Sequence, residues 1–409
     1  MSEEKTQVIH EDLNRSLQER HIQLIALGGA IGVGLFLGSA SAIEKAGPGV
    51  VLAYIIAGIA IFFVMRALGE LTVEYPVSGS FSAHAYQVLS PLAGYVSGWN
   101  YWYVWVVTCM AEITAVGVYV HLWLPDLPQW ISCLVALGLM TCANLFSVKA
   151  YGEFEFWFAI IKIAAVIAMV IVGLTLIFLA VPNSSGIIPG FSNLFTQQGG
   201  FFPHGFLSAQ ALHPADAAQA SGPSPSGLIG FLDSFQFSGM LMALVVVMFS
   251  FGGTELIGIA AAEADDPGKS IPKATNEVVW RILAFYIAAP AVIMAVVPWQ
   301  EIGRPDARGV VVSPFVQIFN TAGFSIAADI LNFVCLTAVI SVYNSGLYSN
   351  SRMLYSLSRQ GNAPKYLGHV NKRGVPVASV LTSAAITAIA VVVVFLWPDF
   401  AFTYLLAIA

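Results

Sequence analysis

Long runs of apolar residues, separated by short polar stretches, recur along the whole chain. A helix needs about 20 apolar residues to cross a bilayer, and nine of these runs are long enough. The tenth run stops at the last residue, so we expect the chain to be truncated within its tenth helix. The pattern predicts an all-α integral membrane protein. The ten segments lie near residues 22–43, 50–73, 95–122, 130–147, 156–181, 237–262, 279–298, 326–350, 376–397 and 400–409.

Glycine is concentrated in the first segment, in the run Gly28-Gly29-Ala30-Ile31-Gly32-Val33-Gly34. Each glycine inside a helix costs roughly 1 kcal/mol relative to alanine, so the run predicts a break halfway across the membrane. The sixth segment has a similar weak point at Gly252-Gly253. Broken backbone at membrane depth is tolerated where it lines a cavity, and secondary transporters bind charged substrates at such breaks. The alternative is that these glycines only allow close helix packing.

Breaks in the first and sixth segments favour a 5+5 inverted repeat with discontinuous helices 1 and 6, and a binding site where the breaks meet. On this interpretation residues 1–21 form a tail and residues 22–181 the first repeat. Residues 182–236 are then a connecting loop, and residues 237–409 are an incomplete second repeat. Within the loop, Ala209 to Gly227 is rich in Pro, Gly, Ser and Ala, which predicts a flexible stretch without a core.

Composition supports the membrane assignment and orients the chain. The sequence is 57% hydrophobic and 10% charged, with a mean hydropathy of +0.78, whereas soluble domains carry roughly 25% charged residues. Most of the 17 Lys and Arg residues fall on the side of the N-terminal tail, and the 182–236 loop has none. The positive-inside rule therefore predicts a cytoplasmic N-terminus and an extracytoplasmic loop.

Several other classes of protein are disfavoured by the same sequence. No basic cluster suggests a nucleic-acid partner, and the four cysteines show neither metal-ligand nor disulfide spacing. No nucleophile–base pair or metal cluster indicates an enzyme. We therefore expect no catalytic residues, no metal and no cofactor.

Four sequence blocks resemble one known family, the bacterial amino acid permeases of the amino acid–polyamine–organocation superfamily. Within it, Phe249–Gly253 and Ser341–Ser345 resemble the aromatic and phenylalanine permeases most. The sequence departs from the family at Val33, where Thr or Ser is common, and at Thr254, where relatives of this subgroup often have Leu. The blocks are Arg20–Gly29 with Ile31-Gly32 and Gly34–Phe36, Arg66–Glu70 with Pro76–Phe81, Gly252–Ile259 with Ser270–Ala274, and Asn344–Leu354 with Gly361–Lys365.

The resemblance implies a leucine-transporter-type fold in the bacterial inner membrane, twelve spans in the complete family members, and transport of an amino acid. An amino acid is a zwitterion, and both of its charges need partners in a low-dielectric region. Amide groups at the start of the second half-helix can hold the carboxylate, and carbonyls ending the first halves, around Ala26, Leu27 and residues 249–251, can hold the ammonium. The predicted substrate-binding residues are Ala30, Ile31, Gly32, Val33, Gly34, Glu112, Phe249, Ser250, Phe251 and Asn344.

Three charged residues well inside the apolar segments are candidates for function. By the resemblance, Lys162 is the lysine whose ammonium replaces the sodium ion of sodium-coupled members, although its side chain could also reach the cytoplasmic surface. Glu255 follows the second break and could carry a proton or cap the resumed helix. Lys162 and Glu255 are therefore the predicted proton-coupling pair. Glu112 could face the pocket or link helices, and Asn344 could likewise serve the pocket or helix packing.

The sequence thus predicts a secondary transporter that imports an aromatic or other neutral L-amino acid by proton symport and alternating access. Its expected partners are the amino acid, protons and membrane lipid. An amino acid exchanger, or a carrier of small neutral amino acids such as threonine or proline, is the alternative within this class. A membrane sensor that binds an amino acid without carrying it is the alternative from another class.

Overall fold

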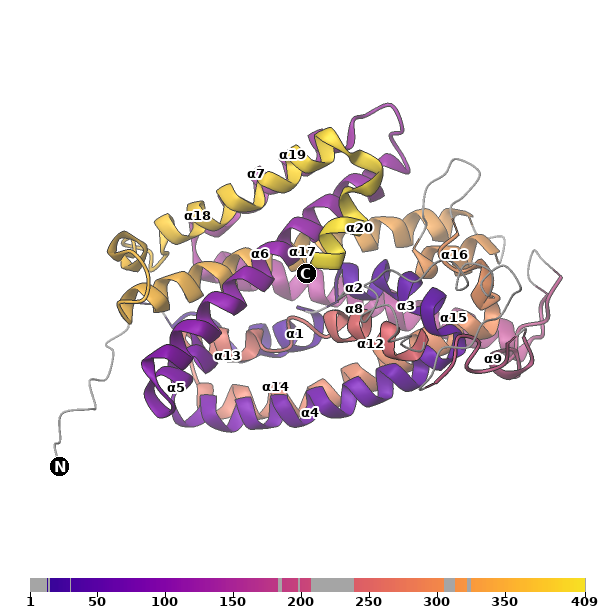
Figure 1. Ribbon diagram of the computed structural model, residues 1–409, viewed down its shortest axis with the longest axis horizontal. Coiled ribbons are helices and arrows are strands. Elements are labelled where there is room, and N and C mark those ends of the chain that lie inside the picture. Colours follow the sequence, from indigo (N-terminus) through magenta and orange to yellow (C-terminus); the bar gives the residue numbers. More distant parts are fainter. Residues whose placement is uncertain are drawn as a thin grey trace, which may run out of the picture.

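The computed structural model describes residues 13, 15–29, 31–182, 186–197, 199–206, 239–304, 313–321 and 325–408. Ala30 and the predicted flexible stretch Ala209 to Gly227 therefore lie outside the described residues. Helices make up most of the described chain, and the long ones run side by side along one axis (Figure 1). Seven helical stretches within these ranges are long and apolar enough to cross a membrane. The predicted all-α architecture is confirmed.

The helices follow the predicted segments closely. They are α1 (Glu19–Gly28), α2 (Val33–Phe36), α3 (Gly38–Ala46), α4 (Val50–Glu74), α5 (Ser80–Val88), α6 (Pro91–His121), α7 (Gln129–Phe146), α8 (Val148–Phe178), α9 (Asn193–Thr196), α12 (Gly239–Ser250), α13 (Leu256–Ala260), α14 (Pro267–Arg281), the π-helical η3 (Ile282–Ala288), α15 (Ala289–Val296), α16 (Pro314–Thr321), α17 (Ser325–Arg359), α18 (Val377–Thr387), α19 (Ile389–Leu396) and α20 (Pro398–Ile408).

One boundary differs in a way that matters for the site. The segment predicted near 279–298 begins at Pro267, because Asp266 accepts a hydrogen bond from the Lys269 amide and caps the helix, with Pro267 at its first position. This first part of α14 is amphipathic, so apolar length alone did not reveal it. Arg281, the last residue of this helix, is fully buried.

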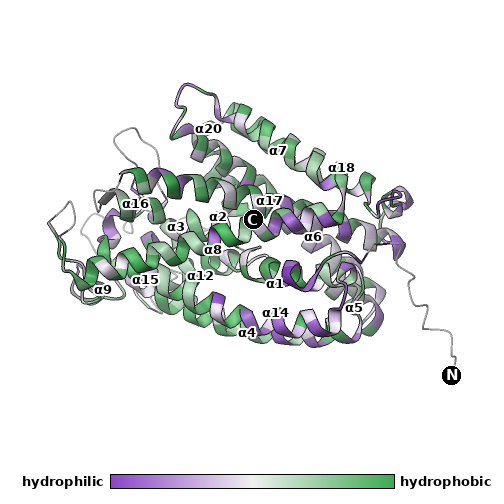
Figure 2. Cartoon of the chain, turned by 180° about the vertical axis from the view of Figure 1, so that it is seen from behind, coloured by the Kyte–Doolittle hydropathy of each residue, from purple (hydrophilic) through white to green (hydrophobic). Residues whose placement is uncertain are grey.

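Two helices, α17 and α6, form the centre of the bundle and pack against each other. The pair α4 and α14 lies along one side, and α7 with α18 and α19 lies along the other (Figure 1). Large apolar side chains point outward on the long helices, such as Phe63 on α4 and Phe178 on α8, as a lipid-facing surface requires. Hydrophobic colouring accordingly dominates these helices in Figure 2.

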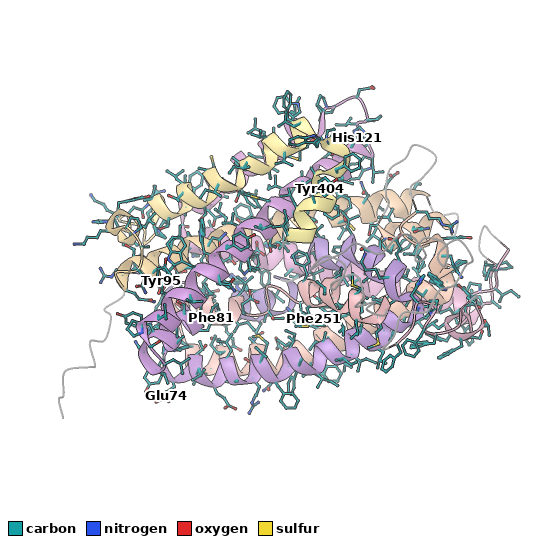
Figure 3. All side chains as sticks on the ribbon, viewed as in Figure 1. Glu74, Phe81, Tyr95, His121, Phe251 and Tyr404 are labelled. Carbon is teal, nitrogen blue, oxygen red and sulfur yellow. The ribbon has the colours of Figure 1, made fainter. Side chains whose placement is uncertain are left out.

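Polar contacts gather at the end of the bundle where α1 begins, which we call the Glu19 end. There, Glu19 forms ion pairs with Lys269 at 2.9 Å and Lys273 at 3.0 Å, which tie α1 to α14. Hydrogen bonds from these two lysines lower the pKa of the partly exposed Glu19 carboxyl to about 2. Glu74, where α4 ends, and His121, where α6 ends, lie at opposite ends of the bundle (Figure 3).

A buried ion pair closes the same end. Arg352 on α17 donates two hydrogen bonds to the carboxylate of Glu263, at 3.1 and 3.2 Å, and Tyr348 also donates to this carboxylate. Two-point pairing of this kind fixes the angle between the groups as well as their distance. It holds α17 against the short segment between α13 and α14.

Candidate functional site

The first predicted break lies between α1 and α2. Helix α1 ends at Gly28 and α2 starts at Val33. The last carbonyls of α1 and the first amides of α2 therefore have no hydrogen-bond partners within their own helices. Two buried cations meet the carbonyl end: Lys162 Nζ donates to the Gly28 carbonyl at 2.6 Å, and Arg281 donates to the Ala26 carbonyl. Both contacts place positive charge at the negative end of a helix, where it is stabilising.

The second predicted break lies between α12 and α13. Helix α12 ends at Ser250, and the turn that follows needs Gly253, whose φ of +96° is accessible to glycine at low cost. The Glu255 side chain turns back and accepts a hydrogen bond from the Gly253 amide at 3.0 Å. Glu255 therefore stabilises the turn at the break, whereas its side chain forms no capping hydrogen bond with α13, the structural role expected from the sequence.

The two breaks touch each other. Ser250 Oγ donates to the Gly34 carbonyl at 2.8 Å, which joins the end of α12 to α2. The approach is so close that a Cβ atom at position 34 would lie 2.8 Å from Ser250 Cα. A glycine is required here because a side chain would push the two segments apart.

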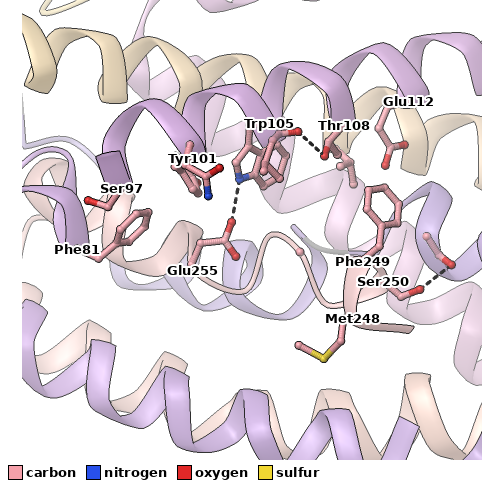
Figure 4. A pocket seen from close by; sticks show the side chains of 15 residues that line it. Phe81, Ser97, Tyr101, Trp105, Thr108, Glu112, Met248, Phe249, Ser250 and Glu255 are labelled. Atoms are coloured by element: carbon pink, nitrogen blue, oxygen red, sulfur yellow. Dashed lines mark hydrogen bonds between the residues drawn. The ribbon is translucent and has the colours of Figure 1, made fainter. Parts of the chain in front are cut away.

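A cavity of about 410 Å³ lies beside this junction, between α6, α12 and the second break (Figure 4). Its volume falls in the range of small-molecule sites. One face of α6 lines it with Tyr101, Trp105, Thr108 and Glu112, which are spaced four, three and four residues apart as neighbours on a helix are. This spacing was visible in the sequence, but only Glu112 was predicted to belong to the site.

Aromatic rings form much of the cavity wall. Phe81 and Tyr101 pack edge to face with ring centres 4.9 Å apart, and Trp105 follows one turn further along α6. Phe249, one of the residues expected to bind substrate, lines the cavity from α12. Trp105 Nε1 also donates to Glu255 Oε1 at 2.8 Å, which ties α6 to the second break (Figure 4). The site is thus mostly apolar, with a few polar groups in fixed positions.

Glu112 both lines the cavity and links helices, so its two predicted roles coexist. Its carboxylate accepts the Val33 amide, with Oε1 at 3.1 Å and Oε2 at 3.2 Å. Only 2% of the residue is exposed. The amide at the start of α2, which we expected to hold the substrate carboxylate, is therefore occupied by a carboxylate of the protein itself.

Several predicted residues lie away from the cavity. Phe251 is buried on another side of the turn, where it stacks on Tyr286 with ring centres 4.4 Å apart and packs against Tyr54. Its ring does not contribute to the cavity wall, because these neighbours hold it elsewhere. Ile31 and Gly32 are buried next to the break without lining the cavity, whereas Gly34 and Ser250 do line it.

Lys162 and Asn344 belong to a separate buried cluster between α8 and α17. Lys162 Nζ donates to Ser341 Oγ at 3.0 Å, and Ser341 Oγ donates to Glu155 Oε2 at 2.7 Å. Asn344 Nδ2 donates to the other oxygen, Glu155 Oε1, at 2.8 Å. Glu155 was missed from sequence, although it lies two helical turns before Lys162 and therefore on the same face of α8.

A family model described as amino acid permease matches residues 21–409, which include every element of this site. The chain belongs to the amino acid permease family. The permease is 49% identical over 398 residues to the aromatic amino acid transport protein AroP of Escherichia coli O6:H1, a match covering 97% of this chain and 78% of AroP. It is also 49% identical over 399 residues to the uncharacterized amino acid permease YtnA of Bacillus subtilis strain 168, covering 98% of this chain and 78% of YtnA.

The fold of the permease is similar to that of a Na⁺-coupled sialic acid symporter solved in a substrate-bound outward-open state. The two align with a TM-score of 0.57 and 12% identity, over 98% of this chain and 79% of the symporter. At this identity the likeness concerns the fold alone. Together with the family match, it confirms a multi-pass membrane protein of an amino acid transport family, as the resemblance had predicted.

Proposed function

We propose that this permease imports an aromatic or other neutral L-amino acid together with a proton, by alternating access. We place it in the bacterial inner membrane with its N-terminus in the cytoplasm, so that the Glu19 end faces inward. Residues 22–181 and 237–409 would form the two inverted repeats, linked by the 182–236 loop. The positive charge near the Glu19 end, including Lys269 and Lys273, supports this orientation.

Aromatic cargo is supported by the walls of the cavity and by the AroP relative. Rings stack favourably on other rings, and Phe81, Tyr101, Trp105 and Phe249 all line the cavity. In this proposal Phe249 covers the bound side chain. The cargo carboxylate approaches the amides at the start of α2, near Gly32, Val33 and Gly34, and displaces Glu112 from the Val33 amide.

The ammonium of the cargo needs acceptors on the opposite side of the pocket. The Ala26 carbonyl is already engaged by Arg281, so it is a poorer candidate than we expected from sequence. Glu255 offers a carboxylate at the cavity wall. We therefore assign the ammonium to the neighbourhood of Glu255 and the carbonyls of residues 249–251.

Proton coupling rests on one observation, the position of Lys162. This fully buried ammonium joins the Gly28 carbonyl at the first break to Ser341 on α17. A charge held between two parts that must separate during transport can make that separation depend on its protonation.

Uptake of labelled phenylalanine into proteoliposomes, with and without an imposed proton gradient, tests this proposal. Wild-type protein should accumulate the label only with the gradient, and Lys162→Met should lose accumulation while still inserting and binding the amino acid. Lys149→Met, an exposed lysine on the same helix, is the matched control and should behave as wild type.

The other outcomes separate the alternatives. Accumulation that depends on a preloaded internal amino acid instead of the gradient would identify an exchanger. Competition by threonine or proline but not by phenylalanine or tryptophan would identify a carrier of small neutral amino acids. Binding without entry of label would identify a sensor.

A further inference from the structure

The buried cluster between α8 and α17 contains a second ionisable group that the proposed mechanism does not yet use. Glu155 and Ser341 are both completely buried, and so is Lys162. An isolated carboxylate is very costly in such a place, so its partners define its role. Glu155 accepts hydrogen bonds on both oxygens, from Ser341 and from Asn344.

Two consecutive hydrogen bonds lead from Lys162 to Glu155. Lys162 Nζ donates to Ser341 Oγ at 3.0 Å, and the Ser341 hydroxyl donates to Glu155 Oε2 at 2.7 Å. Both distances are short enough for a proton to pass along each bond. We propose that Glu155 exchanges the coupling proton with Lys162 through the hydroxyl of Ser341. This inference rests on the proposed proton symport and names the residue that receives the proton.

The step balances without any other reactant. One proton leaves the Lys162 ammonium for Ser341 Oγ, while the hydroxyl proton of Ser341 moves to Glu155 Oε2. The N–H electron pair stays on Nζ, so an ammonium and a carboxylate become an amine and a carboxylic acid. The conversion removes both charges from a water-poor region, and the reverse step restores them.

A second amide fixes the acceptor in place. Asn144 Nδ2 on α7 donates to Asn344 Oδ1 at 2.7 Å, which leaves the Asn344 amide hydrogens directed at Glu155. Titratable groups near the pair are Tyr151 on α8, Glu112 on α6 and Arg281 on α14. Within the described residues none of these three groups forms a hydrogen bond with Lys162 or Glu155, so the direct exchange involves this pair.

Hydroxyl groups continue from Glu155 toward the Glu19 end. One turn earlier on α8, the Tyr151 hydroxyl lies 3.2 Å from Ser345 Oγ of α17. The Tyr151 ring stacks on Tyr348 with centres 4.0 Å apart, and Tyr348 donates to Glu263. Glu155 therefore stands between Lys162 and a line of polar groups that leads to the end we assign to the cytoplasm.

The test compares two substitutions of Glu155 with opposite properties. Glu155→Gln keeps the volume and can accept from Ser341 but cannot hold an exchangeable acid proton, whereas Glu155→Asp keeps the acid and shortens the side chain. Gradient-driven uptake should fall about tenfold or more in Glu155→Gln, because the amide cannot take up the transferred proton, and remain higher in Glu155→Asp. Counterflow exchange at equal pH needs no net proton transfer and should persist in both.

A purely structural role for Glu155 predicts the reverse order, with the isosteric Gln better tolerated than Asp, and that result would overturn the inference. Ser341→Ala and Ser341→Thr give an independent pair if Glu155→Gln does not fold. Loss of driven uptake in the alanine variant and its retention in the threonine variant are expected, and equal activity would count against the proton route.

Failure of this inference can be told apart from failure of the proposed function. Wild-type uptake that ignores the proton gradient would reject the symport itself. Wild-type uptake that requires the gradient and Lys162, but is unchanged in Glu155→Gln, would reject only the role of Glu155.

Discussion

Replacement of Gly34 by alanine probes the contact between the two breaks most directly. The new Cβ would lie 2.8 Å from Ser250 Cα, 3.1 Å from Phe249 Cδ1 and 3.2 Å from Ser250 Oγ. The first neighbour is backbone, so the two segments must separate to make room. Such overpacking costs about 1–3 kcal/mol, which corresponds to about a 5- to 150-fold change in an equilibrium constant.

A second glycine on the following helix supplies the control. At Gly38 the nearest side-chain atom to a new Cβ is Val246 Cγ1 at 3.6 Å, an ordinary contact distance. Gly38→Ala should therefore be neutral or slightly stabilising, because alanine favours a helix over glycine by roughly 1 kcal/mol.

Equilibrium binding of labelled phenylalanine to purified protein, with thermal unfolding measured in the same detergent, is the assay. We expect Gly34→Ala to weaken binding within the stated range, because Phe249 and the amides of α2 lose their relative position. Equal affinity in the two alanine variants would refute the argument that the junction of the breaks shapes the site.

Two further predictions concern groups at the cavity and at the Glu19 end. Trp105→Phe keeps an aromatic wall but removes the 2.8 Å hydrogen bond to Glu255, a charged acceptor, so the affinity for labelled phenylalanine should fall about tenfold. Trp157→Phe, which changes an exposed ring, is the control and should bind as wild type. Equal affinities of the two variants would contradict this prediction. Because the pKa of Glu19 is lowered from 4.5 to about 2, its ion pairs are complete above pH 4.5 and are lost only as the pH falls toward 2. Glu19→Gln should consequently leave the slope of uptake against pH unchanged between about pH 6 and 8, and a flattened slope would assign Glu19 to proton coupling.

The breaks were predictable because their cause is local. Glycine density at Gly28–Gly34 and Gly252-Gly253 weakens a helix whatever surrounds it, and the structure interrupts both segments. Helix α14 shows that the length of an apolar run does not by itself give the start of a helix. Its polar start carries lysines that resemble a connecting segment, and the cap at Asp266 that begins the helix is not registered by hydropathy.

The site was less predictable because it depends on partners distant in sequence. Phe249 and Phe251 both flank the second break in the sequence, yet only Phe251 packs against Tyr54 and Tyr286, away from the cavity. Glu155 reaches Lys162 through Ser341, which is 186 residues further along the chain. The spacing of Glu155 and Lys162 on one helix face could have revealed a pair, but not the serine between them.

The hydrogen bond from the Val33 amide to Glu112 has a thermodynamic consequence for any ligand with an acid group. The acid group of such a ligand replaces the Glu112 carboxylate at the Val33 amide. The measured affinity therefore reflects the difference between two similar hydrogen bonds, one to the ligand and one to Glu112. A low net affinity and fast dissociation then follow even when each contact between the ligand and the protein is strong. An amine that lacks the acid group does not compete for this amide, so the hydrogen bond between Val33 and Glu112 would persist when the amine binds.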